Sequence, residues 1–311
     1  MSVAPQRAVV FAYHNVGVRG LSVLLSLGVE VPLVVTHRDD PNENIWFSSV
    51  SALAACHGIP VITPDDPNTP EVLARVGDYA PDWLFSFYYR HMLKGELLAA
   101  PRSGAFNLHG SLLPKYRGRV PVNWAVLHGE RQTGASLHRM VLKPDAGSLV
   151  DQEAVAILPN DTAHEVFQKV TCAAEALLLR AVPLMLTGRY EERPLDLAGG
   201  SYFGGRRPED GRLDWGQSAR QVHNLIRAVA PPYPGAFTDV GGTRLRLLGS
   251  YYRGEPARGL GPRLYWEDGR CHADCADGRR ILLTRLAAGD RDLGETEFAS
   301  LLGSAEIHLP C

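Results

Sequence analysis

The first half of the chain alternates short apolar runs with segments whose apolar residues recur at helical spacing. The short runs, rich in β-branched and aromatic residues, predict strands, and the segments between them predict helices. Strands are expected at 8–12, 31–36, 60–62 and 83–88 and in the residues leading to Asn107, and helices at 20–27 and 48–57. This alternation is typical of a parallel sheet with crossover helices. The pattern predicts an α/β fold with a Rossmann-like open, mostly parallel sheet.

The middle of the chain predicts the end of this sheet and one long helix. Two further strands are expected at 137–141 and 148–157. Thr162 and Glu165 have the spacing of a capping box, which marks the start of a helix. That helix is expected to run toward Gly188, with Pro183 as a kink or an early end.

The last third of the chain predicts a second, smaller domain. Charges, Pro and a Gly-Gly pair between residues 191 and 205 indicate a linker. Beyond it, a helix at 219–228 is followed by short strands between glycine-rich turns, a pattern that favours a small barrel-like, OB-like fold. We therefore expect a first domain at 1–190, a linker at 191–205 and a barrel-like domain at 206–304.

Composition and charge narrow the classes of function. With 311 residues and 45% hydrophobic content, the chain can bury a large core. Its net charge of -2 provides no general basic field for a polyanion, so no nucleic-acid partner is expected. The N-terminal apolar run at 8–12 is too short for a signal peptide, and no stretch is long enough to span a bilayer. We expect no membrane insertion.

The cysteines indicate neither a disulfide framework nor a metal site. The five cysteines stand at 56, 172, 271, 275 and 311 without regular spacing. Cys271 and Cys275, with His272 between them, lack a second ligand pair at zinc spacing. We expect no metal, and free thiols in a reducing cytoplasm.

One polar segment, residues 106–119, is unlike an ordinary core strand. Asn107 and His109 stand two residues apart, so on a strand they share one face. Gly110-Ser111 and Leu113-Pro114 would end the strand directly after them. We expect both side chains at a strand end.

This pair suits acyl transfer to an amine. The Asn107 amide could stabilise the oxyanion of a tetrahedral intermediate, and His109 could move the proton that the amine loses. A turn at 143–147 could bring Asp145 beside His109, where a carboxylate would hold the imidazole tautomer and raise its pKa. Each residue alone could be structural: a turn former, a core histidine and a solvated turn residue. The combination, in this order, favours catalysis without a Ser or Cys nucleophile or a metal.

The string from Phe106 to Arg119, followed by Lys143-Pro144-Asp145-Ala146-Gly147, resembles the signature of the formyltransferases that use 10-formyltetrahydrofolate. The resemblance implies that Asn107, His109 and Asp145 carry catalysis and that 10-formyltetrahydrofolate is the co-substrate. It covers nearly the whole chain, because 224–230 and 234–237 are similar to the opening of that family's C-terminal domain.

Four stretches, at 10–14, 85–91, 107–119 and 203–207, resemble the ArnA-type branch of that superfamily. The resemblance implies formylation of the 4-amino group of a UDP-linked aminosugar, UDP-4-amino-4-deoxy-L-arabinose, in lipid A and lipopolysaccharide biosynthesis and polymyxin resistance. The bifunctional member of the branch carries a further decarboxylase domain, so this chain is expected to supply the formyl-transfer half alone. A separate decarboxylase partner is an open possibility.

The resemblance also implies a set of folate contacts. Backbone groups of a segment after the fourth predicted strand would lie against the pterin, and an arginine and the turn carrying Asp145 would complete the pocket. These residues are His91, Met92, Leu93, Arg119, Val141, Leu142, Lys143, Pro144 and Asp145.

Several alternatives stay open at this point. The same trio and two-domain plan occur in methionyl-tRNA formyltransferase, although the loop at 38–44 holds three acids and one base, which would repel phosphates. Another nucleotide-linked aminosugar could be the acceptor, and a binding protein with a dead site is a further class. A dehydrogenase would need a glycine fingerprint that the segment around Gly17 and Gly20 lacks.

The sequence assigns no role to His138 or Arg139, which alternate on a predicted strand. The aromatic residues at 88–89 could stack on a ring or simply pack, and Arg206-Arg207 could hold a diphosphate or lie in a solvated linker. The identity of the aminosugar, the residues that contact it and the oligomeric state are left undetermined.

Overall fold

The computed structural model describes residues 6–309, and the chain divides into two compact units. The first comprises Met1–Pro121, Thr133–Val155 and Gln168–Gly204, and the second comprises Val122–Gln132, Ala156–Phe167 and Gly205–Cys311. Neither unit is continuous in the sequence, since two short segments from the middle of the chain belong with the C-terminal unit.

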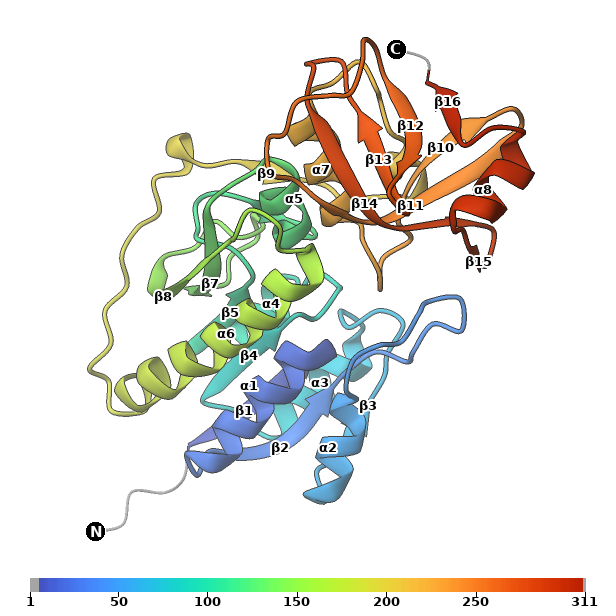
Figure 1. The fold of residues 1–311 in the computed structure, drawn as a ribbon. Helices are drawn as coiled ribbons and strands as arrows, with labels where there is room; N and C mark the ends of the chain where they lie inside the picture. The colour runs from blue at the N-terminus through green and yellow to red at the C-terminus, as the bar shows by residue number, and fades with distance from the viewer. Residues whose placement is uncertain (1–5, 310–311) are drawn as a thin grey trace. The chain divides into compact units, whose positions relative to one another are not determined.

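The first unit is built on a seven-stranded sheet with the order β3-β2-β1-β4-β5-β7-β8 (Figure 1). Its strands are β1 (Arg7–Ala12), β2 (Glu30–Val35), β3 (Val61–Ile62), β4 (Trp83–Phe87), β5 (Gly104–His109), β7 (Gln132–Arg139) and β8 (Leu149–Ala156). The pairs from β3 to β5 are parallel, and β7 is antiparallel to β5. The predicted α/β fold with an open, mostly parallel sheet is confirmed.

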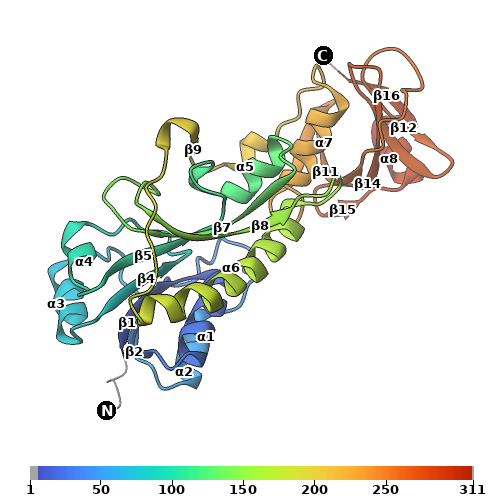
Figure 2. The same cartoon turned by 90° about the vertical axis from the view of Figure 1, so that its left-hand side faces the viewer.

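Helices cover both faces of this sheet, as Figure 2 shows, with α1 and α6 on one face and α3 and α4 on the other. The helices are α1 (His14–Ser26), α2 (Val50–Cys56), α3 (Pro70–Asp78), α4 (Gly95–Ala99) and α6 (Ala163–Leu186), whose first turn belongs to the second unit. Because both faces are covered, every residue of the central strand β4 is buried, which explains why four of its five residues are apolar.

Two helices differ from their predicted bounds, and in each case a local cause is visible. Helix α1 begins six residues before the predicted start at Gly20, because Gly20 is a packing residue within the helix. A Cβ there would lie 2.5 Å from the Phe87 ring, so glycine allows α1 to approach β4 closely.

Helix α6 begins at the predicted capping box, in which the side chains of Thr162 and Glu165 each accept a hydrogen bond from the other's backbone N–H. It continues past Pro183 to Leu186, so Pro183 is not an early end.

Two short strands attach the segment after α6 to the polar segment of the first unit. Strand β6 (Arg117–Gly118) pairs in parallel with β9 (Tyr202–Phe203), and the Tyr116 and Phe203 rings stack at 5.4 Å. Residues 202 and 203, predicted to lie in a linker, therefore support the turn that follows β5.

The second unit is built on an antiparallel sheet with the order β10-β11-β14-β13-β12-β16, which curls into a half-barrel (Figure 1). Its elements are α5 (Pro121–Leu127), α7 (Ala219–Ala228), β10 (Ala236–Val240), β11 (Thr243–Tyr251), β12 (Arg263–Glu267), β13 (Arg270–Asp274), β14 (Arg280–Ala288), β15 (Arg291–Asp292), α8 (Glu295–Leu302) and β16 (Glu306–His308). Register shifts between β11 and β14 at Gly249 bend the sheet. The barrel-like prediction is confirmed, but helix α8 was not predicted.

Four cysteines, Cys56, Cys172, Cys271 and Cys275, are free thiols, and Cys311 lies outside the described residues. Burial raises the pKa of Cys271 and of Cys275 to about 12. Across residues 6–309, no helix is both long enough and apolar enough to cross a membrane.

Candidate active site

The polar segment lies where three strands of the first unit meet. Strand β4 pairs with β5 in parallel, so the two carboxyl ends lie at the same edge of the sheet, where ligands bind in open α/β folds. Strand β7 pairs with β5 in the opposite direction, with His138 directly across from Asn107 and Ser136 across from His109. Asn107 and His109 thus lie at the end of β5, as predicted from their spacing.

The structure brings the three predicted catalytic side chains together. His109 Nδ1 lies 3.6 Å from Asp145 Oδ1, and Asn107 Nδ2 lies 3.5 Å from the same oxygen. The second carboxylate oxygen of Asp145 accepts a hydrogen bond of 2.8 Å from the backbone N–H of Gly118. The fold therefore brings the Asp145 carboxylate next to side chains of β5 that lie as far as 38 residues earlier in the sequence.

The turn that carries Asp145 is held in an unusual backbone conformation. Asp145 has φ of 49°, in the left-handed region that non-glycine residues seldom adopt. Two residues later, a Cβ at Gly147 would collide with the carbonyl oxygen of Arg139, so only glycine lets the turn lie this close to the end of β7. The geometry of this turn thus requires glycine at position 147.

His109 is buried, and its ring has two different neighbours. Its Nε2 lies 2.7 Å from the Tyr116 carbonyl oxygen, which can only accept, so this nitrogen carries a hydrogen. The Nδ1 atom therefore faces the carboxylate of Asp145. Burial lowers the pKa of His109, although Asp145 and the Tyr116 carbonyl act in the opposite direction. Asp145 does raise this pKa, as expected, but removal from water outweighs the carboxylate, so the net shift is downward.

The Asp145 carboxylate stays ionised in this setting. Burial by itself would raise the pKa of Asp145, but His109, His138 and the N–H of Gly118 together hold it well below its usual range. A fixed negative charge next to a neutral buried imidazole is the arrangement that stabilises a proton arriving at that imidazole.

His138 belongs to this cluster, although the sequence assigned it no role. Its side chain is 2% exposed, and its Nε2 lies 3.2 Å from Asn107 Nδ2 and 3.5 Å from Asp145 Oδ1. The alternation on β7 showed that one of His138 and Arg139 would face the site. Choosing between them requires the antiparallel register of β5 and β7, which the sequence does not state.

The predicted folate contacts form two neighbouring segments beside the trio. Leu142 is 71% exposed, and its side chain lies 3.8 Å from the place where a Cβ of Gly95 would stand, so the turn at 141–145 lies next to the segment after β4. Met92 and Val141 are also exposed apolar residues. Leu93 is 1% exposed in the core, so it could offer a ligand only its backbone.

Arg119 and the residues after β4 complete this part of the sheet edge. Arg119 is exposed, with one guanidinium nitrogen 3.5 Å from the Arg90 carbonyl oxygen. Tyr89 stacks on His37 at 4.1 Å, and Arg90 forms a bidentate pair with Glu43 in the loop after β2. These two residues are therefore occupied by packing and ion pairing.

Tyr88, the first residue after β4, lies against the residue that follows His109. It has φ of 57°, and a Cβ added at Gly110, next to His109, would collide with its hydroxyl oxygen. The glycine after His109 thus makes room for the Tyr88 phenol.

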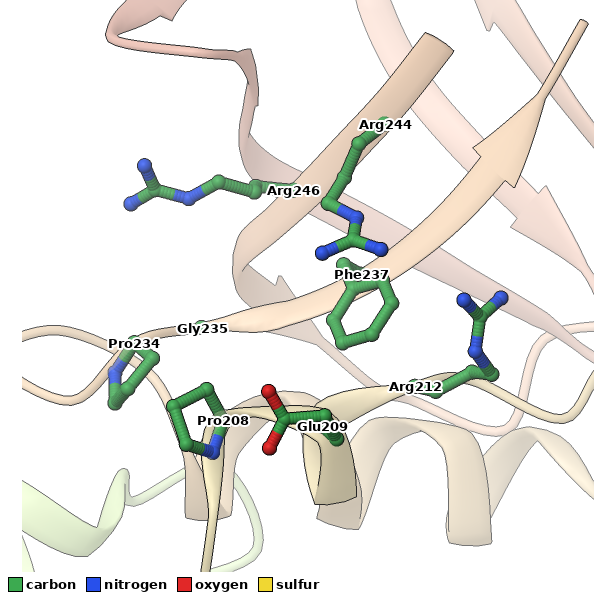
Figure 3. Close-up of a pocket in the computed structure, with 8 residues that line it drawn as sticks. All are labelled: Pro208, Glu209, Arg212, Pro234, Gly235, Phe237, Arg244 and Arg246. Carbon is green, nitrogen blue, oxygen red and sulfur yellow. The ribbon is translucent and has the colours of Figure 1, made fainter. Parts of the chain in front are cut away.

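The second unit contains a pocket of about 420 Å³ that none of the predicted site residues line. It is lined by Pro208, Glu209, Arg212, Pro234, Gly235, Phe237, Arg244 and Arg246 (Figure 3). The guanidinium carbons of Arg244 and Arg212 lie 4.1 Å and 4.9 Å from the centre of the Phe237 ring. Both arginines also pair with Asp239.

Of the predicted pair Arg206-Arg207, Arg206 lies over the Trp124 ring, with its guanidinium carbon 4.8 Å from the ring centre.

The described part of the chain contains no candidate metal site. Over residues 6–309, the His, Cys, Asp and Glu side chains form no group of three or more that could hold a metal ion.

Solved structures with the same fold include sugar-modifying enzymes. One is WlaRD, a sugar 3N-formyltransferase crystallised in the presence of dTDP and 5-N-formyl-THF, with a TM-score of 0.73, 18% identity, and coverage of 93% of this chain and 100% of that chain. Another is the N-formyltransferase from Helicobacter canadensis in complex with folinic acid and dTDP-3-aminofucose, with a TM-score of 0.70, 20% identity, and coverage of 90% and 98%. A sugar N-formyltransferase from a Shewanella species matches with a TM-score of 0.63, 17% identity, and coverage of 81% and 100%.

Two family models match successive parts of the chain. The model described as formyl transferase matches residues 24–182, which include the whole trio, and the model described as formyl transferase, C-terminal domain, matches residues 206–300. The first match alone spans more than half of the 311 residues. The chain belongs to the formyl transferase family.

Proposed function

We propose that the protein transfers a formyl group from 10-formyltetrahydrofolate to the 4-amino group of a UDP-linked aminosugar, with UDP-4-amino-4-deoxy-L-arabinose as the first candidate. One observation carries the proposal: the side chains of Asn107 and His109, at the end of β5, both lie within 3.6 Å of one carboxylate oxygen of Asp145. An amide donor, a neutral imidazole and an ionised carboxylate are the groups that formyl transfer to an amine requires.

The proposed reaction begins when the unprotonated amine attacks the formyl carbon of the folate. Asn107 donates an N–H to the oxyanion of the tetrahedral intermediate, a contact typically worth about a hundred- to a thousand-fold in rate. His109 takes the proton that the amine loses at Nδ1, because Nε2 already carries a hydrogen toward the Tyr116 carbonyl. The imidazolium is stabilised by Asp145, 3.6 Å away, until it passes the proton to the leaving folate nitrogen.

The proposed catalytic domain comprises residues 1–190, joined by a linker at 191–205 to a barrel-like domain at 206–304. Within the first of these, the folate is proposed to lie against the backbone of His91, Met92 and Leu93 and against the turn at 141–145, with Arg119 at the rim. The exposed apolar side chains of Met92, Val141 and Leu142 suit a flat heteroaromatic ring.

Two observations favour an aminosugar as the acceptor. The first is similarity to known proteins. Structures with the same fold were crystallised with dTDP or dTDP-3-aminofucose, and the four ArnA-like stretches of the sequence resemble the UDP-4-aminosugar branch. The second is the Tyr88 phenol, which lies against Gly110 and so places an aromatic ring next to the residue that follows His109. The aminosugar could also be another nucleotide-linked one.

Methionyl-tRNA formyltransferase is the alternative reaction. The three acids of the loop at 38–44 argue against a tRNA, although two of its acids are engaged internally: Asp39 accepts a hydrogen bond of 2.9 Å from Tyr13, and Glu43 pairs with Arg90. We expect no nucleic-acid partner and no membrane insertion. Whether a separate decarboxylase partner is needed is tested by assaying the chain alone.

The experiment is a panel of acceptors. The purified chain is incubated with 10-formyltetrahydrofolate and each of UDP-4-amino-4-deoxy-L-arabinose, dTDP-linked 3- and 4-aminosugars and methionyl-tRNA, and the release of tetrahydrofolate is followed. The proposal predicts turnover with the UDP-aminosugar and none with the tRNA at any salt concentration. Formylation of the tRNA alone would overturn the substrate assignment.

A further inference from the structure

The side chain of His138 touches the proposed trio without belonging to it. It comes from β7, is 2% exposed, and stands directly opposite Asn107 in the antiparallel pairing of β5 and β7. We propose that His138 is a positioning residue that holds the Asn107 carboxamide in the orientation needed to stabilise the oxyanion. This inference rests on the proposed function, in which Asn107 is the oxyanion donor.

The hydrogen-bond partners of His138 determine which of its nitrogens can accept. Its Nδ1 lies 2.9 Å from the Arg139 carbonyl oxygen. A carbonyl oxygen only accepts, so Nδ1 must carry a hydrogen. In the neutral ring, Nε2 then has a free lone pair, and this atom lies 3.2 Å from Asn107 Nδ2. The Asn107 amide therefore donates to His138.

This bond settles which end of the Asn107 amide faces the cluster. The amide nitrogen lies 3.2 Å from His138 Nε2 and 3.5 Å from Asp145 Oδ1, two acceptors that are themselves 3.5 Å apart. Turning the amide over would place its oxygen against both acceptors and leave none of the three a donor. The flipped form is therefore disfavoured, and the NH₂ group is retained at the reacting side.

The two contacts to the amide are not equally good. The contact with Asp145 lies at the outer limit of a hydrogen bond, whereas the contact with His138 is shorter. One amide hydrogen is thus committed to His138. Because the carboxamide is planar, this bond also fixes the direction of the other hydrogen, which the carboxylate holds only weakly and which is left for a developing oxyanion. His138 restrains the amide while leaving that second hydrogen for the reaction.

A matched pair of substitutions separates this role from simple core packing. In His138→Gln, the side-chain oxygen can take the place of Nε2 as an acceptor, whereas His138→Met has a similar length and shape without that acceptor. Neither restores the bond to the Arg139 carbonyl, so the comparison isolates the contact with Asn107. Thermal unfolding and the Kd for 5-formyltetrahydrofolate report whether the fold and the folate pocket survive.

The expected result concerns kcat. We expect His138→Met to lower kcat roughly tenfold or more, with the folate Kd and the KM for the acceptor close to wild type, because the amide is needed chiefly in the transition state. His138→Gln is expected to recover most of the loss. If His138→Met does not fold, His138→Phe keeps an aromatic ring of similar volume and replaces it in the same comparison.

A double-mutant cycle decides whether the effect passes through Asn107. In an Asn107→Ala background, measured by single-turnover formyl transfer, His138→Met should cause almost no further loss, because the residue it positions is gone. A full and multiplicative loss in that background would overturn the inference alone, as would a folded His138→Gln variant as slow as His138→Met. An Asn107→Ala variant with wild-type turnover would overturn the proposed role of Asn107 and this inference with it.

Discussion

Two regions of the molecule hold polar side chains next to a carboxylate. The first is the trio cluster of the first unit, which is the trio Asn107, His109 and Asp145 together with the neighbouring His138. The second is the arginine pocket, the pocket of the second unit that Arg212, Arg244 and Arg246 help to line. In the trio cluster the groups are unlike, an amide and two imidazoles, and Asp145 is largely buried. In the arginine pocket they are alike: Arg212 and Arg244 pair with Asp239, and both arginine side chains are more than half exposed. The two carboxylates therefore differ in their neighbours and in their exposure to water.

Burial accounts for the difference. In the trio cluster it lowers the pKa of His109, while the neighbouring imidazoles keep Asp145 ionised, so a proton acceptor and a fixed charge coexist near neutral pH. In the arginine pocket the side chains of Arg212 and Arg244 are more than half exposed, so water screens their attraction to Asp239, which neutralises two guanidinium groups that lie over Phe237. Grouped charges alone do not make a catalytic site, because exclusion of water is also needed.

The largest expected effect comes from removing the carboxylate of the trio cluster. Asp145→Asn should lower kcat by about a thousand-fold or more, as loss of an orienting carboxylate beside a catalytic histidine does elsewhere. The folate Kd should change little. Asp239→Asn is the matched control from the arginine pocket, and its kcat should equal that of wild type. Equal losses in both variants would erase the distinction between the two regions.

A smaller loss is expected from the amide. Asn107→Ala should lower kcat by about a hundred- to a thousand-fold, because one oxyanion donor is removed while the imidazole and carboxylate remain. Steady-state formyl transfer under saturating folate measures the change. A higher KM with unchanged kcat would instead assign Asn107 to ground-state binding.

The third effect is a shift in protonation rather than a loss of rate. Burial lowers the pKa of His109 from its ordinary value of about 6.5. The neutral, proton-accepting form therefore persists below that pH, and it is lost only as the pH falls through the lowered pKa. NMR titration of ring-labelled histidine, assigned with His109→Gln, should show a midpoint below about 6.5.

The Asp145→Asn variant is the control for this titration. Asp145 raises the pKa of His109 against the effect of burial, so Asp145→Asn should move the midpoint lower still. A midpoint above the ordinary value in the wild-type protein would show that His109 is more hydrated than its burial indicates.

The smallest effect is expected in the arginine pocket. Arg244→Gln removes one of two guanidinium groups that share an exposed carboxylate, and such pairs contribute little to folding. The urea midpoint and the rate of formyl transfer should both match wild type. A marked loss of formyl transfer would assign this pocket a part in catalysis.

The sequence was sufficient for the features that depend on local spacing. Alternating strands and helices predicted the sheet, the two-residue spacing of Asn107 and His109 placed them on one face, and the Pro-Asp-Ala-Gly turn brought Asp145 to them. The capping box at Thr162 predicted the start of α6 because its two hydrogen bonds are local.

Features that depend on pairing between distant segments could not be predicted. The role of His138 requires the register of β5 against β7, and the lowered pKa of His109 requires the depth of burial beneath the following turn. The arginine pocket combines residues of β10, β11 and the segment around Pro208, which no local pattern links. Helix α1 begins at His14, before its predicted start, because Gly20 is not a helix boundary but a residue inside the helix that packs closely against Phe87.

We propose that the His109 imidazole and the Asp145 carboxylate act as one unit in formyl transfer. The most direct test is single-turnover formyl transfer to UDP-4-amino-4-deoxy-L-arabinose by His109→Gln, by Asp145→Asn and by the double variant. We expect the double variant to be about as slow as the slower single variant, since residues that act as a unit cannot be lost twice. Losses that multiply, or single variants that keep wild-type rates, would contradict it.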